Sequence, residues 1–352
     1  MNKFEIRKMS SDKNIDDYDI FIDGKVFYQI LNERKCVSLP DNNLETFDDL
    51  CFAWTKGLDF WGDVRFVWNL INRKKAIVPI LMCPDDLDFS CVVLVVEVEK
   101  TENSVIWKRA GYVCEEDYNL DDEKQKGILD TEHYSDRDWE KYGDNIALAK
   151  VDSDEWLQWI ADNWDEEVFR RLMNYTLPKY EIDGNIIWFA DLDFEFESYQ
   201  YEMVIDEYWK QQTLFELNCY TYRPMTFTDC VKIIKKLTRD GEEKLDEHLM
   251  DFGEVLLHIY ASDEVGNQLF DLLQKNEDVL LIEIYCKVIE LMWKYGTDEV
   301  VNVVDVTLLE RLSDDVIVWN RLGEYISVEF KEYINNDLLR TNVAMCGVLP
   351  MK

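Results

Sequence analysis

Along the last third of the chain, apolar residues recur every three or four positions in three successive runs. The apolar positions of these runs are Leu280, Leu281, Ile284, Val288, Leu291 and Met292; Val300, Val303, Val304, Leu308, Leu309 and Leu312; and Val318, Leu322, Tyr325, Ile326, Phe330 and Ile334. This spacing predicts three consecutive helices. The short polar segments between them offer Thr297 or Asp298, and then Ser313 or Asp314, as caps for the next helix.

Upstream, the pattern changes to short apolar runs that are typical of β-strands. Strands are predicted at residues 4–8, 18–22, 76–83, 91–99 and 105–109, and the Asp23-Gly24 dipeptide predicts a tight turn. A further hairpin is predicted over residues 180–189, around Asp183-Gly184. Together these patterns predict an α+β protein, in which a mixed α/β domain with an antiparallel sheet, residues 1–220, precedes an all-helical domain, residues 221–352.

Helices are also predicted outside the three runs. They cover residues 166–173, with Pro178 as the stop signal, residues 198–212, and then residues 228–237, 244–259 and 265–274. The helices after residue 221 have similar lengths and short connections. This organisation predicts a HEAT- or armadillo-like stack, which is a common scaffold for docking other proteins.

Charge limits the possible partners. The 352 residues include 73 acidic and 38 basic residues, for a net charge of −35. Residues 222–352 hold 25 acidic and 14 basic residues (−11), so the first 221 residues carry −24, and residues 115–200 alone hold 25 acidic and 8 basic residues (−17). Such a surface repels nucleic acid and anionic membranes, and it favours rapid, salt-sensitive capture of a basic protein.

The sequence contains few features that indicate a cellular compartment or a cofactor. No run approaches the roughly 20 apolar residues of a membrane span, and the first residues lack the apolar core of a signal peptide, so a cytoplasmic protein is predicted. The nine cysteines are scattered, which fits a reducing compartment. The sequence contains no H-E-x-x-H, G-x-G-x-x-G, Walker or G-x-S-x-G motif. No cofactor and no catalytic residue is therefore expected.

One cysteine pair allows an alternative. Cys83 and Cys91 lie between two predicted strands, where a zinc knuckle can form if further ligands are close. The nearest additional candidates are Asp86 and Asp88, but structural zinc sites of this type are usually rich in thiolates. The competing interpretation is a hairpin loop with two neighbouring thiols and no metal.

The same loop belongs to a wider pattern. The segment 4–8, the Asp23-Gly24-Lys25 turn, Cys83-Pro84 with Cys91, Ile106-Trp107 and Gly111-Tyr112 follow one another along the chain. In this order they resemble a bacterial family of small domains with a C-P-x-C-x4-C loop between two strands, and Asp86 stands where that family has its second cysteine. The family's closing aromatic segment resembles residues 194–201. The resemblance implies an insertion at about residues 115–180.

The helical part carries a second resemblance. The segments 289–293 (IELMW), 302–306 (NVVDV), 308–310 (LLE) and 330–335 (FKEYIN), together with Trp319, resemble a helical family of immunity proteins of bacterial polymorphic toxin systems. That family binds a cognate toxin domain in the cytoplasm and neutralises it without catalysis. The resemblance therefore implies an immunity protein, with a protein toxin domain as its partner.

The leading hypothesis is an acidic surface that docks on a basic toxin domain. The candidate contact residues are Glu115, Glu116, Asp117, Asp121 and Asp122 in the acidic segment, and Asp298, Glu299, Asp314 and Asp315 at the helix breaks. Each of these residues is also explained as a solvated loop residue or a helix cap. Two alternatives stay open: a metal- or thiol-dependent enzyme that uses Cys83 and Cys91, and an inhibitor whose carboxylates mimic the phosphates of DNA.

Overall fold

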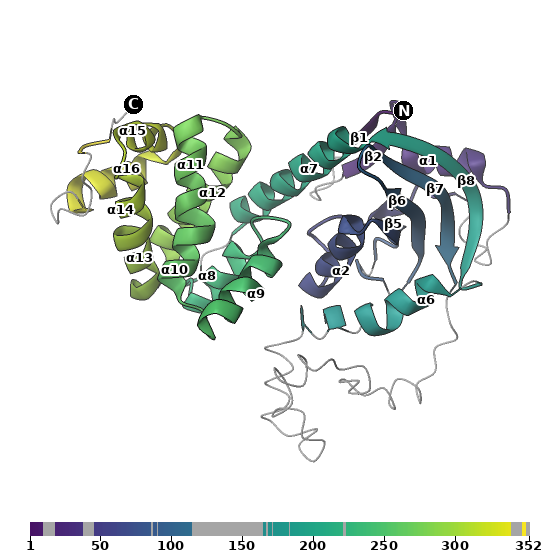
Figure 1. Cartoon of the computed structure of the whole chain (residues 1–352), viewed down its shortest axis with the longest axis horizontal. Helices are drawn as coiled ribbons and strands as arrows, with labels where there is room; N and C mark the ends of the chain where they lie inside the picture. Colours follow the sequence, from purple (N-terminus) through teal and green to yellow (C-terminus); the bar gives the residue numbers. More distant parts are fainter. Residues whose placement is uncertain are drawn as a thin grey trace, which may run out of the picture. The chain divides into compact units, whose positions relative to one another are not determined.

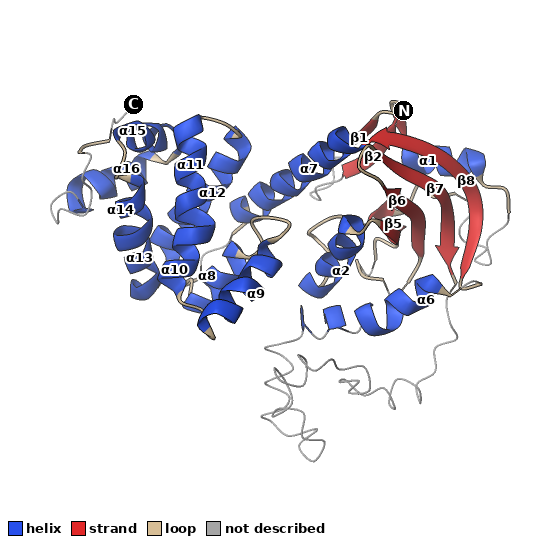
Figure 2. Ribbon diagram, in the orientation of Figure 1, coloured by secondary structure: helices blue, strands red, loops and turns tan. Residues whose placement is uncertain are grey.

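The chain forms two compact units. The computed structural model describes residues 1–9, 18–37, 46–85, 87–89, 91–114, 165–166, 168–170, 172–182, 184–220, 223–338 and 347–349. The units are Met1–Ile205 and Asp206–Lys352 (Figure 1). The first contains the sheets and the second is helical, so the fold is α+β (Figure 2). The division falls inside helix α7 (Ser198–Asn218), whereas the composition of the sequence suggests a boundary near residue 220.

A small antiparallel sheet opens the N-terminal unit. Its strands are β1 (Phe4–Lys8), β2 (Tyr18–Ile22) and β3 (Lys25–Val26), and both longer strands were predicted. Asp23 and Gly24 connect β2 to β3 with φ angles of 53° and 82°. Two positive φ angles in a two-residue loop match the right-handed twist of the flanking strands, which explains the Asp-Gly dipeptide. The predicted tight turn is confirmed.

The larger sheet has five antiparallel strands in sequence order. They are β4 (Cys51–Phe52), β5 (Lys75–Met82), β6 (Val93–Lys100), β7 (Ser104–Val113) and β8 (Ile186–Glu197). The strands predicted at residues 91–99 and 105–109 are confirmed as the paired strands β6 and β7, although β7 continues to Val113. Strands β7 and β8 pair directly, so residues 114–185 form an excursion between two neighbouring strands, and its described part includes the π-helical turn η3 (Leu172–Thr176) and helix α6 (Leu177–Glu181).

Two predictions in this region are wrong. Residues 180–189 do not form a hairpin, because Tyr180 belongs to α6 and Ile186 begins β8. Pro178 does not end a helix but lies in the first turn of α6. The amide of a residue in the first turn has no partner within the helix, so proline costs little there, and its fixed φ favours the helical start.

Strand β8 shows the clearest alternation in the chain. Leu192, Phe194 and Phe196 are buried, whereas Asp191, Asp193 and Glu195 are exposed. The period of two matches a strand with one buried face. The buried residues join an aromatic core around Trp107, whose ring is 5.5 Å from Phe4, 5.3 Å from Phe27 and 5.4 Å from Phe196.

The outer edge of β8 is covered by the N-terminal region. The backbone N–H of Asn2 donates to the carbonyl of Glu195 at 2.6 Å, and the N–H of Cys36 donates to the carbonyl of Phe189 at 2.8 Å. Between them, the guanidinium of Arg34 donates to the carbonyls of Asp191 and Leu192 at 3.1 and 2.5 Å. These bonds satisfy the backbone carbonyls of the last strand without another strand.

Three helices complete the core of the first unit. They are α1 (Phe27–Arg34), α2 (Trp61–Asn72) and the first turns of α7. Helix α2 packs against β5 and buries Phe66 and Trp68. The start of α7 supplies Tyr201, whose hydroxyl accepts a hydrogen bond of 3.2 Å from the indole N–H of Trp107.

The C-terminal unit consists of helices from α7 onward. Their bounds are α8 (Phe227–Ile234), α9 (Gly241–Phe252), α10 (Leu257–Ala261), η4 (Ser262–Gly266), α11 (Asn267–Lys275), α12 (Val279–Tyr295), α13 (Asp298–Val303), η5 (Val304–Leu308), α14 (Leu309–Leu312), α15 (Val316–Tyr325), α16 (Val328–Tyr333) and η6 (Ile334–Leu338). The elements named η are π-helical. No helix among the described residues is both long enough and apolar enough to cross a membrane.

Two predicted helices are each divided in the structure. The helix predicted over residues 244–259 ends at Phe252, because Gly253 adopts a left-handed φ of 75° at the cap position. Glycine is favoured there because it has no Cβ to clash in that conformation. The third apolar run is interrupted at Ile326 and Ser327, where α15 ends and the side chain of Ser327 caps α16.

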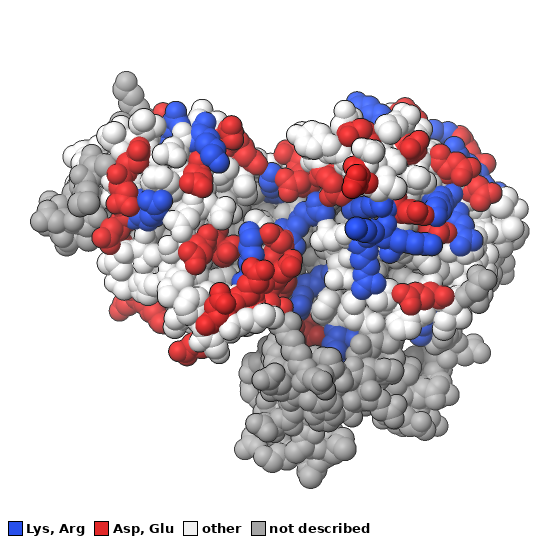
Figure 3. Space-filling model, viewed as in Figure 1, with Lys and Arg blue, Asp and Glu red and all other residues white. Residues whose placement is uncertain are grey.

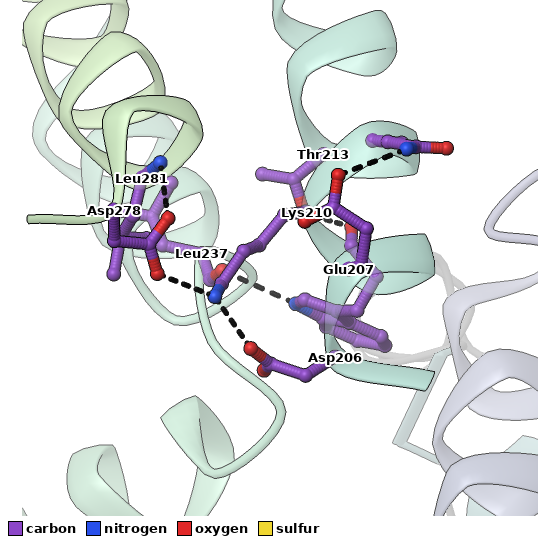
Figure 4. Close-up of polar contacts among 9 residues, drawn as sticks. Asp206, Glu207, Lys210, Thr213, Leu237, Asp278 and Leu281 are labelled. Carbon is purple, nitrogen blue, oxygen red and sulfur yellow. Dashed lines mark hydrogen bonds and ion pairs between the residues drawn. The ribbon is translucent and has the colours of Figure 1, made fainter. Parts of the chain in front are cut away.

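Lysine 210 joins the second half of α7 to the start of α12. Its ammonium lies 2.5 Å from Asp206 and 2.6 Å from Asp278 (Figure 4). Asp278 also caps α12 by accepting the backbone N–H of Leu281 at 3.1 Å. Burial alone would lower the pKa of Lys210, but the hydrogen bonds and charges of the two aspartates outweigh it and raise that pKa. The ammonium therefore stays charged in a partly buried position.

Candidate partner-binding surface

The predicted contact residues fall into two groups. Glu115, Glu116, Asp117, Asp121 and Asp122 lie outside the described residues. Asp298, Glu299, Asp314 and Asp315 lie in the helical unit, at the starts of α13 and α15. The structure therefore locates four of the nine predicted residues, and these four differ in what they contact.

Asp298 and Glu299 form the first turn of α13 and are exposed. Neither side chain caps the helix. Thr297 occupies the cap position without a side-chain hydrogen bond. Carboxylates at a helix start are favoured by the helix dipole, and that electrostatic effect accounts for their position. Both carboxylates are open to solvent and to a basic partner.

Asp314 and Asp315 are already engaged. Asp315 is the cap of α15, since its Oδ1 accepts the backbone N–H of Ile317 at 2.7 Å and that of Val318 at 3.1 Å. Asp314 pairs with the guanidinium of Arg311 at 3.2 Å. The prediction that Ser313 or Asp314 caps this helix is therefore wrong by one or two positions. Asp315 has a structural role that is sufficient to explain it.

A larger acidic surface lies on α9 and was not predicted. Residues 241–254 contain six acidic residues and one lysine. Glu243, Glu247 and Asp251 are exposed and four residues apart, so they follow one face of the helix, and Glu254 is exposed just beyond its end. Figure 3 shows acidic side chains gathered over this part of the helical unit.

Two large apolar side chains accompany these carboxylates. Met250 is 72% exposed and Phe252 is 45% exposed. Met250 lies on the same face as Glu243 and Glu247, three residues beyond the second of them. We call Glu243, Glu247, Met250, Asp251, Phe252 and Glu254 the α9 surface. Exposed methionine and aromatic residues surrounded by charge are typical of the centre and rim of a protein interface.

In the described part of the chain, the lysines beside α9 form ion pairs outside the α9 surface. Lys244, the single lysine of α9, turns to Glu264 of η4 at 3.3 Å and to Asp240 at 3.4 Å. Burial raises the pKa of Glu264, and the positive charge of Lys244 opposes that rise. Glu242 pairs with Lys235 at 2.9 Å. These ion pairs attach α9 to its neighbours, and they engage both Lys235 and Lys244.

The end of α9 is fixed by a buried histidine. The Nε2 atom of His248 accepts the backbone N–H of Leu256 at 3.1 Å, and its ring packs 4.7 Å from Phe252 and 5.2 Å from Tyr260. His248 therefore orders the turn after the helix and supports Phe252 from below. Its role is structural.

The described residues of the cysteine loop do not form a set of metal ligands. Cys83 and Cys91 are both partly buried thiols, and the backbone N–H of Cys83 donates to the carbonyl of Val92 at 3.0 Å. A third thiol, Cys51, approaches from β4, with its sulfur 3.9 Å from the carbonyl oxygen of Cys83. Among the described residues, no group of three or more histidine, cysteine or acidic side chains is arranged to hold a metal ion. Asp86 lies outside those residues.

Part of the chain is similar to one protein family. A family described as a domain of unknown function (DUF7674) matches residues 228–340, which run from α8 through η6 and include α9. No curated protein and no solved structure matches the chain. The family match covers the helical unit alone, and its description assigns no activity.

Proposed function

We propose that this chain is an immunity protein, which binds and neutralises a cognate bacterial toxin domain in the cytoplasm by protein–protein contact and without catalysis. The α9 surface is the observation that carries the proposal. It combines four exposed carboxylates, which form no ion pair within the described residues, with two exposed apolar anchors. In this proposal the helical unit is a HEAT- or armadillo-like docking scaffold, and the toxin domain is basic.

The two kinds of residue in the α9 surface have different roles in this proposal. Carboxylates at the rim accelerate the encounter with a basic protein, and this effect weakens with salt because ions screen charges over about 10 Å at 0.1 M. Met250 and Phe252 contribute to the lifetime of the complex, because burying large apolar side chains slows dissociation. Asp298 and Glu299 form a second, smaller acidic site on the same unit.

The test combines protection and binding. The full chain is expressed in a toxin-sensitive bacterium together with each member of a panel of basic toxin domains, and growth is measured. For a domain against which the chain protects, association and dissociation rates are measured at about 50 and 500 mM salt. We expect one domain to be neutralised, with association at least tenfold slower at high salt.

Matched variants locate the surface. We expect Glu243→Lys with Glu247→Lys to reduce association at least tenfold, and Met250→Asp to accelerate dissociation at least tenfold. The control is Asp298→Lys with Glu299→Lys, which changes the charge of the same unit by the same amount. If the control alone abolishes binding, the contact lies at α13 and the assignment to α9 is wrong. A lack of protection and binding across the panel would overturn the proposed function.

A further inference from the structure

The N-terminal unit contains a pocket whose charge contrasts with the rest of the protein. Its volume is about 430 Å³, and it lies on the face of the larger sheet opposite Trp107, next to α6 and the end of α2. Three basic side chains line it, Arg73, Lys75 and Arg109, together with two acidic ones, Glu97 and Glu181, so basic residues outnumber acidic ones by one. Figure 3 shows basic side chains gathered over β5–β7 in this unit. A local excess of positive charge in a protein of net charge −35 requires an explanation.

Two residues that line the pocket, Arg109 and Trp188, stack on one another. The guanidinium of Arg109 lies 3.9 Å from the centre of the Trp188 ring, and its Nε donates to Glu97 at 2.6 Å. Trp188 lies flat because Gly111, its partner on β7, has no side chain to displace the indole. Arg109 is thus held in place by stacking and by one ion pair.

The other two cations are not neutralised. Within the described part of the chain, neither Arg73 nor Lys75 forms an ion pair. The Nε of Arg73 donates to the side-chain oxygen of Asn69 at 3.2 Å, which orients the guanidinium and leaves its other donors available. Lys75 is exposed at the first position of β5, and its cross-strand partner Glu99 is bonded to Lys108. Of the two acidic residues in the lining, Glu97 is paired with Arg109 and Glu181 is exposed. Arginine and lysine donors of this kind recognise carboxylates and phosphates.

Apolar side chains form the rest of the wall. Ile77 of β5 and Ile186 of β8 contribute from the sheet, and Leu177 of α6 contributes from the excursion between β7 and β8. A pocket with apolar walls and a few converging polar groups is the usual form of a small-molecule site. Its volume lies within the range of about 300–1,000 Å³ that such sites occupy.

We propose that this pocket binds a small organic anion, in which a single carboxylate or phosphate head contacts Arg73 and Lys75 and an apolar body lies against Ile77, Leu177 and Ile186. The lining combines unpaired basic groups with apolar side chains, so the ligand is amphiphilic rather than a free inorganic ion. This inference does not depend on the proposed function, because it rests on the N-terminal unit alone.

The test uses the full chain and four probes. Binding of 4-phenylbutyrate, phenyl phosphate, 4-phenylbutanamide and inorganic phosphate is measured by calorimetry and by ligand-observed NMR. We expect at least one of the two amphiphilic anions to bind at least tenfold more tightly than the neutral amide and the inorganic ion. Which of the two binds more tightly distinguishes a carboxylate head from a phosphate head.

Two variants and one control assign the binding to the pocket. We expect Arg73→Gln and Lys75→Gln each to weaken binding of the anion at least fivefold. Lys74→Gln removes the same charge from an exposed neighbour that does not line the pocket, and we expect less than a twofold effect. Equal binding of the amide, equal effects of the three variants, or no binding of any probe at millimolar concentration would overturn the proposal.

Discussion

Gly111 lies directly against the indole of Trp188: a Cβ at Gly111 would be 2.8 Å from Cε3 of that ring and closer still to Cγ2 of Ile186. Real Cβ atoms do not approach other atoms so closely, so the strand β8 side chains must move if a side chain is added. Since Trp188 supports Arg109, this contact links the packing of the sheet to the pocket above it.

Gly111→Ala should therefore destabilise the N-terminal unit. Overpacking of a fixed site typically costs about 1–3 kcal/mol, and we expect a loss in the free energy of unfolding within this range. Chemical denaturation followed by tryptophan fluorescence measures it. The control is Gly57→Ala, where the exposed glycine has more room and its nearest atom is the Thr55 Oγ1 at 3.3 Å, and there we expect a change within about 0.5 kcal/mol.

Asp63 should make stability depend on pH. Burial, followed by the charge of Asp88 and then those of Asp59 and Asp165, raises the pKa of this carboxyl to about 7, although a backbone hydrogen bond from Phe60 opposes the rise. The folded protein therefore keeps the proton that the unfolded chain loses near pH 4. Stability should decrease as pH rises from about 4 to 7, by up to about 4 kcal/mol from this group, and then level off.

The variant Asp63→Asn should remove this dependence. Asparagine can accept the same hydrogen bond from Phe60 without a charge, so the variant should be more stable than the wild type at pH 8 and similar to it at pH 4. Denaturation curves between pH 4 and 8 measure the difference. Asp59→Asn, at an exposed position nearby, should retain most of the slope; an unchanged slope in Asp63→Asn would show that Asp63 is not its source.

Two adjacent aspartates at the start of α15 should behave differently. Asp315→Ala removes the acceptor of two backbone N–H groups and should cost about 1 kcal/mol. Asp314→Ala removes one exposed ion pair with Arg311 and should cost at most a few tenths of a kcal/mol. The comparison by thermal denaturation is direct, because both variants remove one carboxylate from the same turn. Equal losses would contradict the capping role.

Lys210→Met should loosen the attachment of α7 to α12. The substitution leaves Asp206 and Asp278 close together without the cation between them, while the aliphatic stem keeps similar packing. We expect a loss of about 1–2 kcal/mol, discounted because both aspartates are partly solvated, and a smaller loss at high salt. Lys232→Met, on α8, is the control for removal of a lysine from the same unit, and a loss as large there would contradict this account.

Local chemistry explains which elements were predictable. The Asp23-Gly24 turn and the strands beside it follow from backbone preference alone, and α12 follows from its long apolar period. The prediction of a hairpin around Gly184 is wrong, although Gly184 does adopt a positive φ of 105°. A turn residue identifies a change of direction, but it does not reveal that the segment before it is the helix α6 rather than a strand.

The α9 surface shows a different limit. Gly253 is a helix stop signal that the sequence displays, and recognising it would have ended α9 at the correct place. The carboxylates of residues 241–254 are equally visible in the sequence. What the sequence could not show is that Lys244 and Lys235 are committed to internal partners, because those contacts join residues from separate elements. Exposure and pairing are tertiary properties.

The cover on β8 has a consequence for the behaviour of the protein in solution. A twelve-residue edge strand that carries Phe189, Phe194 and Phe196 is a template on which strands of other molecules can assemble. Asn2, Arg34 and Cys36 donate hydrogen bonds to four backbone carbonyls of β8. These bonds leave fewer carbonyls for a strand of another molecule and so oppose self-association. Removing Met1–Lys8 would uncover both Phe196, whose ring centroid lies 5.3 Å from that of Phe4, and the carbonyl of Glu195, and the shortened chain would form aggregates through this strand.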